Sequence, residues 1–293
     1  MITEITSKTI LNHVKQPDPW FGLKYNLNLY RGCQHQCIYC DSRSTCYQIE
    51  NFADIHVKTN AIDLLADALP RKRMRGTIGT GSMNDPYMPV ERQYNLTGRA
   101  LSVIVENQFP VHVLTKSDLV LRDIDLIKEI SQIYAAVSFT ITTPDDQLAK
   151  ELEPAAPPPS SRFKAMQTLS DAGILTGVLM MPILPFIEDT LENITDLVEQ
   201  AHANGASYII PSFGMTLRSG SREYYYAKLD QRFPGIKARY IQRYGSTYGC
   251  YAPNHEQLNR RFEELCQRYG IANRMPSFKP EKVRKLSRQM KLF

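Results

Sequence analysis

Three cysteines lie close together in the segment YRGCQHQCIYC, at Cys33, Cys37 and Cys40, and a fourth, Cys46, follows out of step with them. A structural zinc site usually has four ligands in two pairs, so zinc would have to recruit Cys46 or His35. A ferredoxin-type cluster is held by four cysteines. Three thiolates on a four-iron cluster would leave one iron open, and catalysis at a metal needs such an exchangeable position. The spacing therefore favours a cluster with one open iron.

Composition is consistent with an intracellular protein. The chain has 293 residues, 43% of them hydrophobic, so it can bury a large core, and a single α/β domain of this size is ordinary. It shows no signal peptide and no apolar run long enough to span a membrane, which predicts a soluble cytoplasmic protein. Six cysteines are too sparse for a disulfide scaffold, so their clustering indicates metal or redox chemistry. The net charge of +5 permits a polyanionic partner without requiring one.

Strand and helix signals alternate along the chain, in about six βα units. Regular alternation of this kind predicts a parallel sheet with helices outside, and we expect an α/β fold, a partial (βα)6 TIM-type barrel over residues 24–215. Apolar or β-branched runs predict its strands at residues 25–30, 76–81, 111–116, 135–143, 176–184 and 208–213.

Helix boundaries follow from capping residues. Ser160 or Ser161 is expected to begin one helix and Gly173 to end it. Asp189 and Gly205 are expected to bound the next helix in the same way. A further helix is expected over residues 121–133, where isoleucine and leucine recur every third or fourth position.

The barrel is expected to have an addition at each end. Residues 1–23 are predicted to form an N-terminal arm that packs on the barrel, and residues 216–293 a C-terminal helical, basic and Tyr-rich extension. Aromatic and basic residues together are typical of a groove for unpaired nucleic acid, but helix faces that close the open side of the barrel would look similar. The tyrosines concerned are Tyr224, Tyr225, Tyr226, Tyr240, Tyr244, Tyr248 and Tyr251.

Polar residues follow the predicted strands, where folds of this class place their chemistry. The cysteines follow the first strand and the segment SMNDPY follows the second. Lys116 ends the third strand, and Thr142 and Thr143 end the fourth. We therefore expect the functional site at the carboxyl ends of the strands.

The cysteine motif after the first strand of a (βα)6 pattern resembles the radical S-adenosylmethionine (SAM) superfamily. The segments YRGC, DPYMPVE, LTKSDLVLRD and LEP, with Tyr39 beside the third cysteine, resemble its branch related to spore photoproduct lyase, also called DNA repair photolyase-like. The similarity covers residues 24–215 well and the rest only loosely.

The resemblance implies cofactors and a partner. Cys33, Cys37 and Cys40 would bind a 4Fe-4S cluster, whose open iron would take the amino and carboxylate groups of SAM. Reduction would cleave the sulfonium and form a 5′-deoxyadenosyl radical, so a low-potential electron donor such as flavodoxin or ferredoxin is implied. Radical chemistry of this kind belongs to the cofactor, and the protein positions it.

Four residues match positions at which this family contacts SAM. Tyr39 would pack near the adenine, although core filling would also explain it. Lys116 would bind the SAM carboxylate, although a solvated loop lysine would look the same. Ser138 and Thr140 would contact SAM through their hydroxyls, although both also suit packing in a strand. Arg162 could also reach the SAM carboxylate.

The chain departs from the family pattern after the second strand. Many members have Gly-Gly-Glu there for the SAM amino group, whereas this chain reads GTGSMNDPY; Asn84 and Asp85 are the best polar substitutes, with an ordinary surface turn as the alternative. Spore photoproduct lyases carry a hydrogen-donating cysteine in this loop, where this chain has Ser82. An O–H bond is too strong for that role, which argues against thymine-dimer lyase activity. Cys46 is the candidate hydrogen-atom donor instead, although a structural role would explain it equally well, and Cys250 is a weaker candidate.

The sequence thus predicts a radical SAM enzyme. The substrate hypothesis is a nucleic acid or nucleotide, in a lyase-like or repair-like reaction, and a small metabolite or a protein stays open as an alternative substrate. The alternative from another class is a non-catalytic iron-sulfur or zinc binding module that uses the barrel as a scaffold.

Overall fold

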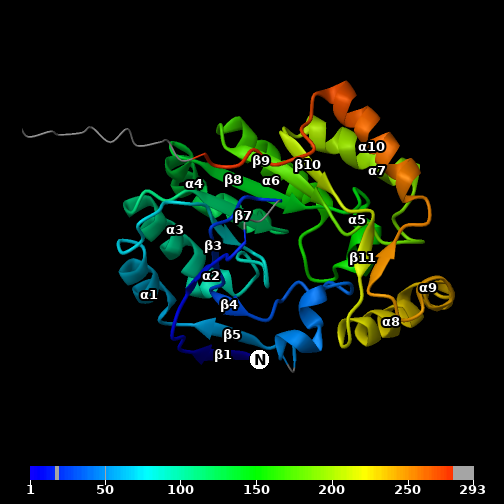
Figure 1. Ribbon diagram of the computed structural model, residues 1–293, viewed down its shortest axis with the longest axis horizontal. Coiled ribbons are helices and arrows are strands. Elements are labelled where there is room, and N and C mark those ends of the chain that lie inside the picture. Colours follow the sequence, from blue (N-terminus) through cyan, green and yellow to red (C-terminus); the bar gives the residue numbers. More distant parts are fainter. Residues whose placement is uncertain (17–19, 50, 280–293) are drawn as a thin grey trace, which may run out of the picture.

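The computed structural model describes residues 1–16, 20–49 and 51–279 and has a seven-stranded sheet at its centre (Figure 1). Six neighbouring strands are parallel, and β2 pairs antiparallel with β3 at one edge. Strands β10 and β2 are the two edge strands and do not pair with each other, so the sheet is open. The predicted α/β fold with a partial barrel is therefore confirmed. In spatial order the strands are β10 (Tyr208–Pro211), β9 (Leu175–Met180), β8 (Ala135–Thr140), β7 (Val111–Thr115), β6 (Ile78–Thr80), β3 (Tyr25–Leu27) and β2 (Leu11–His13).

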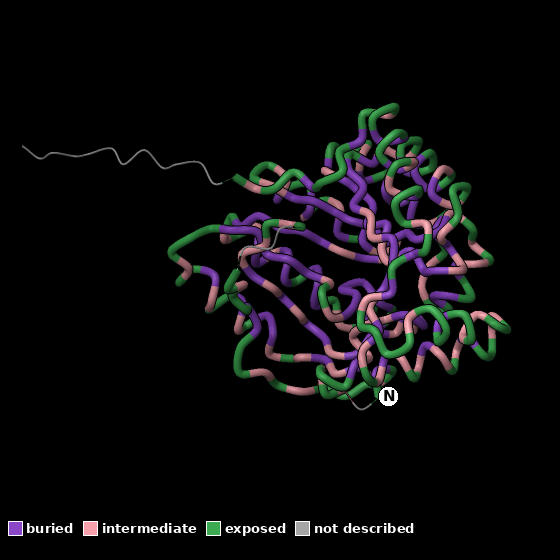
Figure 2. Tube along the Cα trace, turned by 45° about the vertical axis from the view of Figure 1, so that its right-hand side comes forward, coloured by how far each residue is buried: buried purple, intermediate pink, exposed green. Residues whose placement is uncertain are grey.

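Helices cover the sheet from outside. Every residue of β8 is buried, as expected for a parallel strand that is covered on both faces, and the buried interior runs through the whole barrel (Figure 2). Ile127 and Ile130 of α4 are buried, which confirms the apolar face predicted there. The barrel helices are α1 (Ala61–Ala68), α2 (Glu91–Tyr94), α3 (Leu96–Glu106), α4 (Ile124–Ser131), α5 (Asp146–Leu152), α6 (Pro159–Asp171) and α7 (Leu191–Ala203).

The predicted helix starts are wrong by a few residues. Helix α6 begins at Pro159, because proline needs no N–H partner in the first turn and its fixed φ suits a helix. Helix α7 is capped by Thr190, whose side chain accepts a hydrogen bond from the backbone N–H of Asn193. The segment predicted as one helix over residues 121–133 begins as the 3-10 helix η3 (Asp118–Asp123) and continues as α4.

An insertion between β3 and α1 carries the cysteines. It contains β4 (Tyr30–Arg31), the 3-10 helices η1 (Asp41–Arg43) and η2 (Thr45–Tyr47), and β5 (Ile55–Lys58). Strand β5 pairs with β4 and with β1 (Ile2–Ile5), a pairing that the sequence did not predict. The first residues of the chain are thus attached by strand pairing to the segment that follows the cysteine loop.

The C-terminal extension is built on a two-stranded sheet of β11 (Gly214–Thr216) and β12 (Gly249–Tyr251). Between them lie α8 (Ser221–Arg232) and α9 (Ile236–Tyr244), and after them comes α10 (His255–Tyr269), which packs against α7 (Figure 1). Cys266 is buried in α10.

Two of the tyrosines in the extension belong to the core. Tyr225 and Tyr240 are fully buried in a cluster that also contains Ile38 and Tyr39, so α8 and α9 cover the cysteine loop. Among the described helices, none is long and apolar enough to cross a membrane. The boundaries proposed for the arm, barrel and extension stay a prediction, and most of the basic segment at the end of the extension, from residue 280 on, lies outside the described residues.

Candidate functional site

The cysteine loop is held by backbone hydrogen bonds to neighbouring segments. The N–H of Cys33 donates to the carbonyl of Phe52 at 3.1 Å, and the N–H of Ile38 donates to the carbonyl of Leu152 at 2.9 Å. Gly32, in the YRGC segment, has a φ of +83°, and a Cβ there would lie 2.3 Å from the carbonyl oxygen of Asp54. Only glycine fits this close approach, and the turn it makes carries the chain into the cysteine motif.

The first two cysteines are buried and the third is partly exposed. Burial raises the pKa of the Cys33 thiol to about 12 and the pKa of Cys37 well above its ordinary value. Metals bind the thiolate, so cluster binding here must release thiol protons. Within the described part of the chain, no three His, Cys, Asp or Glu side chains are arranged to hold a single metal ion.

A cavity of about 680 Å³ lies beside the cysteine loop at the carboxyl ends of the strands. Its volume is in the range of small-molecule and cofactor sites. Four of the residues predicted to form the site line it, namely Tyr39, Cys40, Lys116 and Thr140. The cavity therefore lies at the strand ends, as predicted, and brings the third cysteine together with the lysine and threonine expected to contact SAM.

Two buried polar atoms in the cavity wall lack a hydrogen-bond partner among the described residues. They are Oδ1 of Asn26, on β3, and Oγ1 of Thr80, at the end of β6. Buried polar atoms nearly always have a hydrogen-bond partner, and a polar ligand in this cavity would supply one to each of these two oxygens. The residues present thus fit SAM. Sequence reasoning missed both residues, although Asn26 between the apolar Tyr25 and Leu27 was a usable signal.

A buried charged cluster lies behind Lys116. Its Nζ is 3.8 Å from Oε1 of Glu153, and an Nη atom of Arg162 is 2.5 Å from the other carboxylate oxygen. The hydroxyl of Tyr39 donates a hydrogen bond to Glu153 as well. Although burial opposes ionisation, Arg162 and Lys116 hold the pKa of Glu153 below its usual value. The only signal for Glu153 in the sequence was its place in the LEP segment.

Arg162 does not line the cavity. Its side chain is 1% exposed, and it donates to the carbonyl of Thr140 at 2.9 Å and to that of Pro157 at 2.8 Å, besides pairing with Glu153. These donors are used within the protein, because the guanidinium lies between Thr140 at the end of β8 and Pro157 in the proline-rich loop of residues 154–158. The geometry gives no support to the expected contact with the SAM carboxylate.

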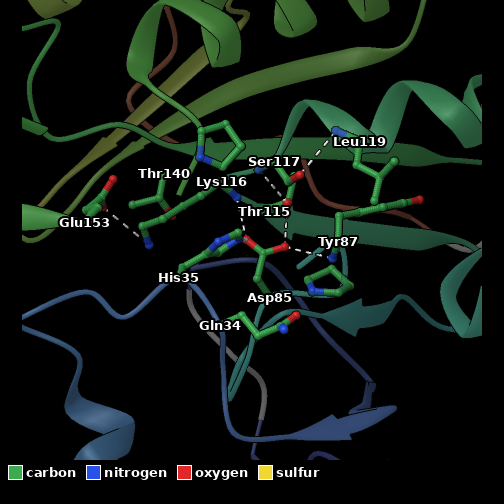
Figure 3. Close-up of polar contacts among 12 residues, drawn as sticks. Gln34, His35, Asp85, Tyr87, Thr115, Lys116, Ser117, Leu119, Thr140 and Glu153 are labelled. Atoms are coloured by element: carbon green, nitrogen blue, oxygen red, sulfur yellow. Dashed lines mark hydrogen bonds and ion pairs between the residues drawn. The ribbon is translucent and has the colours of Figure 1, made fainter. Parts of the chain in front are cut away.

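Asp85 is also committed to the protein (Figure 3). One carboxylate oxygen accepts hydrogen bonds from the hydroxyl of Thr115 at 2.7 Å and the N–H of Tyr87 at 2.8 Å, and the other accepts from the N–H of Lys116 at 2.6 Å. Nε2 of His35 lies 3.1 Å from that second oxygen. Despite burial, His35 and these donors lower the pKa of Asp85 to about 2.

Asn84 and Ser138 likewise have partners within the protein. The amide of Asn84 donates to the carbonyl of Tyr30 at 2.6 Å. Ser138 is fully buried between Nε2 of His112 at 2.8 Å and the hydroxyl of Tyr208 at 2.6 Å. Neither residue lines the cavity, and neither does Asp85, so we assign none of the three a contact with SAM.

Cys46 lies on the surface beside the extension. Its Sγ is 3.5 Å from Nη1 of Arg218, and it is not among the residues that line the cavity. Ser82 does line the cavity, and its hydroxyl is 3.3 Å from Oδ1 of Asn28. In the extension, Tyr248 and Tyr251 are 50% and 66% exposed and form part of the cavity wall.

The fold and the cavity define a partial-barrel protein whose ligand site lies at the strand ends, next to a three-cysteine loop. The chain belongs to the radical SAM superfamily, because the family model described as "Radical SAM superfamily" matches residues 27–210.

Curated relatives span most of the chain. The uncharacterized protein Rv2578c of Mycobacterium tuberculosis is 30% identical over 280 residues, covering 92% of this chain and 81% of the relative. A radical SAM Nalpha-GlyT isomerase of Pseudomonas phage M6 is 26% identical over 181 residues, covering 62% of this chain and 37% of the isomerase.

Solved structures share the fold. A variant of spore photoproduct lyase with bound AdoMet and dinucleoside spore photoproduct superposes with a TM-score of 0.70 at 15% identity, covering 92% of this chain and 79% of the lyase. At this identity the similarity establishes the fold alone. The predicted resemblance to the spore photoproduct lyase branch is therefore confirmed for the fold.

Proposed function

We propose that this protein is a radical SAM enzyme that cleaves SAM at an open-site 4Fe-4S cluster to give a 5′-deoxyadenosyl radical. The observation that carries the proposal is that Cys40, the third cysteine of the loop, lines a cavity that Lys116 and Thr140 also line. Membership of the superfamily supports the same assignment.

The chain's own residues have distinct tasks in this proposal. The three cysteines would hold the cluster, which when bound and reduced would supply the electron for cleaving the sulfonium bond. Lys116 lines the cavity, and its ammonium group would hold the SAM carboxylate, while Tyr39 would pack against the adenine and Thr140 would donate or accept a hydrogen bond. The buried part of the wall, which includes His112, Thr140 and Leu179, would exclude water from the reacting atoms.

The substrate that we propose is a nucleotide or nucleic acid. Exposed tyrosines beside a cationic group suit stacking on unpaired bases, and Tyr248 and Tyr251 line the cavity with Arg218 beside Tyr248. The spore photoproduct lyase that shares the fold holds a dinucleoside photoproduct, which supports a substrate of this class. The reductant that we propose is flavodoxin or ferredoxin.

Anaerobic reconstitution of the wild type and of Cys33→Ala tests the proposal. After dithionite and SAM are added, iron and 5′-deoxyadenosine are measured. We expect about four irons per chain and SAM cleavage in the wild type, and loss of both in the variant. Zinc in place of iron, or a cluster that ignores SAM, would refute the radical function and favour the non-catalytic binding module.

A further inference from the structure

Two buried carboxylates outside the cavity hold Lys116 at different points (Figure 3). Asp85 accepts a hydrogen bond from the backbone N–H of Lys116 at 2.6 Å, and Glu153 lies 3.8 Å from its Nζ. Both carboxylates are nearly inaccessible to solvent, with Asp85 8% and Glu153 3% exposed. The main chain and the side chain of the same lysine are therefore held by different acidic residues.

The same two carboxylates also hold the cysteine loop. Asp85 pairs with His35, which lies between Cys33 and Cys37, and Glu153 accepts the hydroxyl of Tyr39, which lies between Cys37 and Cys40. The loop is thus fixed on both sides of its central cysteine.

Further contacts fix the carboxylates themselves. Asp85 also binds Tyr87 and Thr115, and Glu153 also binds Arg162. Each acid is followed by a proline in the sequence, which restricts the backbone conformation of the acid. Buried ion pairs contribute little net stability compared with apolar packing, so stability alone does not explain two such groups at this place.

We infer that Asp85 and Glu153 are positioning residues that set the ammonium group of Lys116 relative to the cluster-binding loop, and so determine how tightly SAM is held. The inference rests on the proposed function, in which Lys116 binds the SAM carboxylate. Neither carboxylate lines the cavity, so both act through Lys116 and the loop.

A double-mutant cycle on the cluster-loaded protein tests this inference. Asp85→Asn and Glu153→Gln remove each charge at nearly constant shape, and each is made in the wild type and in Lys116→Met. Iron per chain is counted, and SAM affinity is measured by anaerobic equilibrium dialysis against radiolabelled SAM with no reductant present, so that SAM binds without being cleaved. Asp118→Asn and Glu151→Gln are matched controls, because they make the same substitutions two residues from Lys116 and from Glu153.

If the two carboxylates position Lys116, the effects of their variants on SAM affinity should depend on whether Lys116 is present. We expect each single variant to retain iron and to bind SAM about tenfold more weakly than the wild type. In the Lys116→Met background the same substitution should weaken SAM binding by less than a further factor of about two, since the effects of residues that act through one another are not additive. The controls should bind SAM like the wild type.

The inference would be overturned if Asp85→Asn and Glu153→Gln weakened SAM binding by the same factor in the Lys116→Met background as in the wild type. It would also be overturned if both single variants bound SAM as tightly as the controls. If Asp85→Asn retains no cluster, Thr115→Val replaces it, because this change removes one donor to Asp85 and leaves both carboxylates in place. Loss of the cluster in Glu153→Gln would overturn the inference for Glu153, because a positioning role requires that iron is retained. Wild-type protein that carries a full cluster and binds no SAM would refute the proposed function instead, so the two failures are distinguishable.

Discussion

Arg218 and Tyr248 are bound to each other at the edge of the cavity. Nη2 of Arg218 donates to the tyrosine hydroxyl at 2.8 Å, and the guanidinium carbon lies 5.1 Å from the ring centre. Nε of Arg218 also lies 3.6 Å from Oδ1 of Asp41, the residue after the third cysteine. The C-terminal extension is therefore joined to the cysteine loop beside the cavity.

Tyr251→Ala should weaken the binding of single-stranded oligonucleotides. Its ring is 66% exposed at the cavity, and loss of one stacking platform costs about 1 to 3 kcal/mol per base. Fluorescence anisotropy with a labelled oligonucleotide measures the change. Ile241→Ala, which removes a 50% exposed side chain from α9 in the same extension, is the control. Equal affinities for both variants would argue against a nucleic-acid substrate.

Cys46 should be the first thiol to be alkylated. It is exposed, whereas Cys33, Cys37, Cys250 and Cys266 are buried. Iodoacetamide treatment of the cluster-loaded protein followed by peptide mass spectrometry gives the order of reaction. Modification of a buried cysteine before Cys46 would contradict the surface placement of Cys46.

Glu188→Gln should flatten the pH dependence of stability. Burial raises the pKa of Glu188 from 4.5 to about 8, and its side chain is 0% exposed. A carboxyl with a raised folded-state pKa contributes stability that is fully present below pH 4.5. Between pH 4.5 and about 8 that contribution is lost by about 1.4 kcal/mol for each pH unit, because the unfolded chain is ionised there and the folded one is not.

Urea unfolding of the reconstituted protein at about pH 5, 7 and 9 measures this effect. The glutamine variant should gain stability relative to the wild type as the pH rises. Glu192→Gln, an exposed position in the first turn of α7, should change nothing. Parallel pH curves for the wild type and Glu188→Gln would contradict the prediction.

Gly32→Ala should lower both the free energy of unfolding and the iron content of the reconstituted protein. A Cβ at this position would meet the backbone of Asp54 at 2.3 Å, so the turn into the cysteine motif must shift. Gly173→Ala is the matched control: its φ of +81° is similar, but nothing lies within 4 Å of the added Cβ, so it should cost only about 1 kcal/mol of backbone strain. Urea unfolding and iron counts compare the two, and equal effects would show that the close contact does not matter.

Local patterns predicted a large part of this protein. The cysteine spacing and the alternation of apolar runs and amphipathic helices indicated the superfamily, the six parallel strands and the position of Lys116 and Thr140 at the cavity. These features are local, because strand and helix periods and strand-end loops involve residues that are near one another in sequence.

The roles of the polar residues around the cavity were decided by tertiary structure alone. Asp85 looked like a SAM ligand from its loop, but in the fold it meets His35 and the end of β7, and its donors leave no position for a ligand. Glu153 lies 114 residues from Tyr39, yet the two are hydrogen-bonded in the buried cluster. Such pairings depend on which strand ends the sheet brings together, and a buried carboxylate must find its partners there because it cannot be solvated by water.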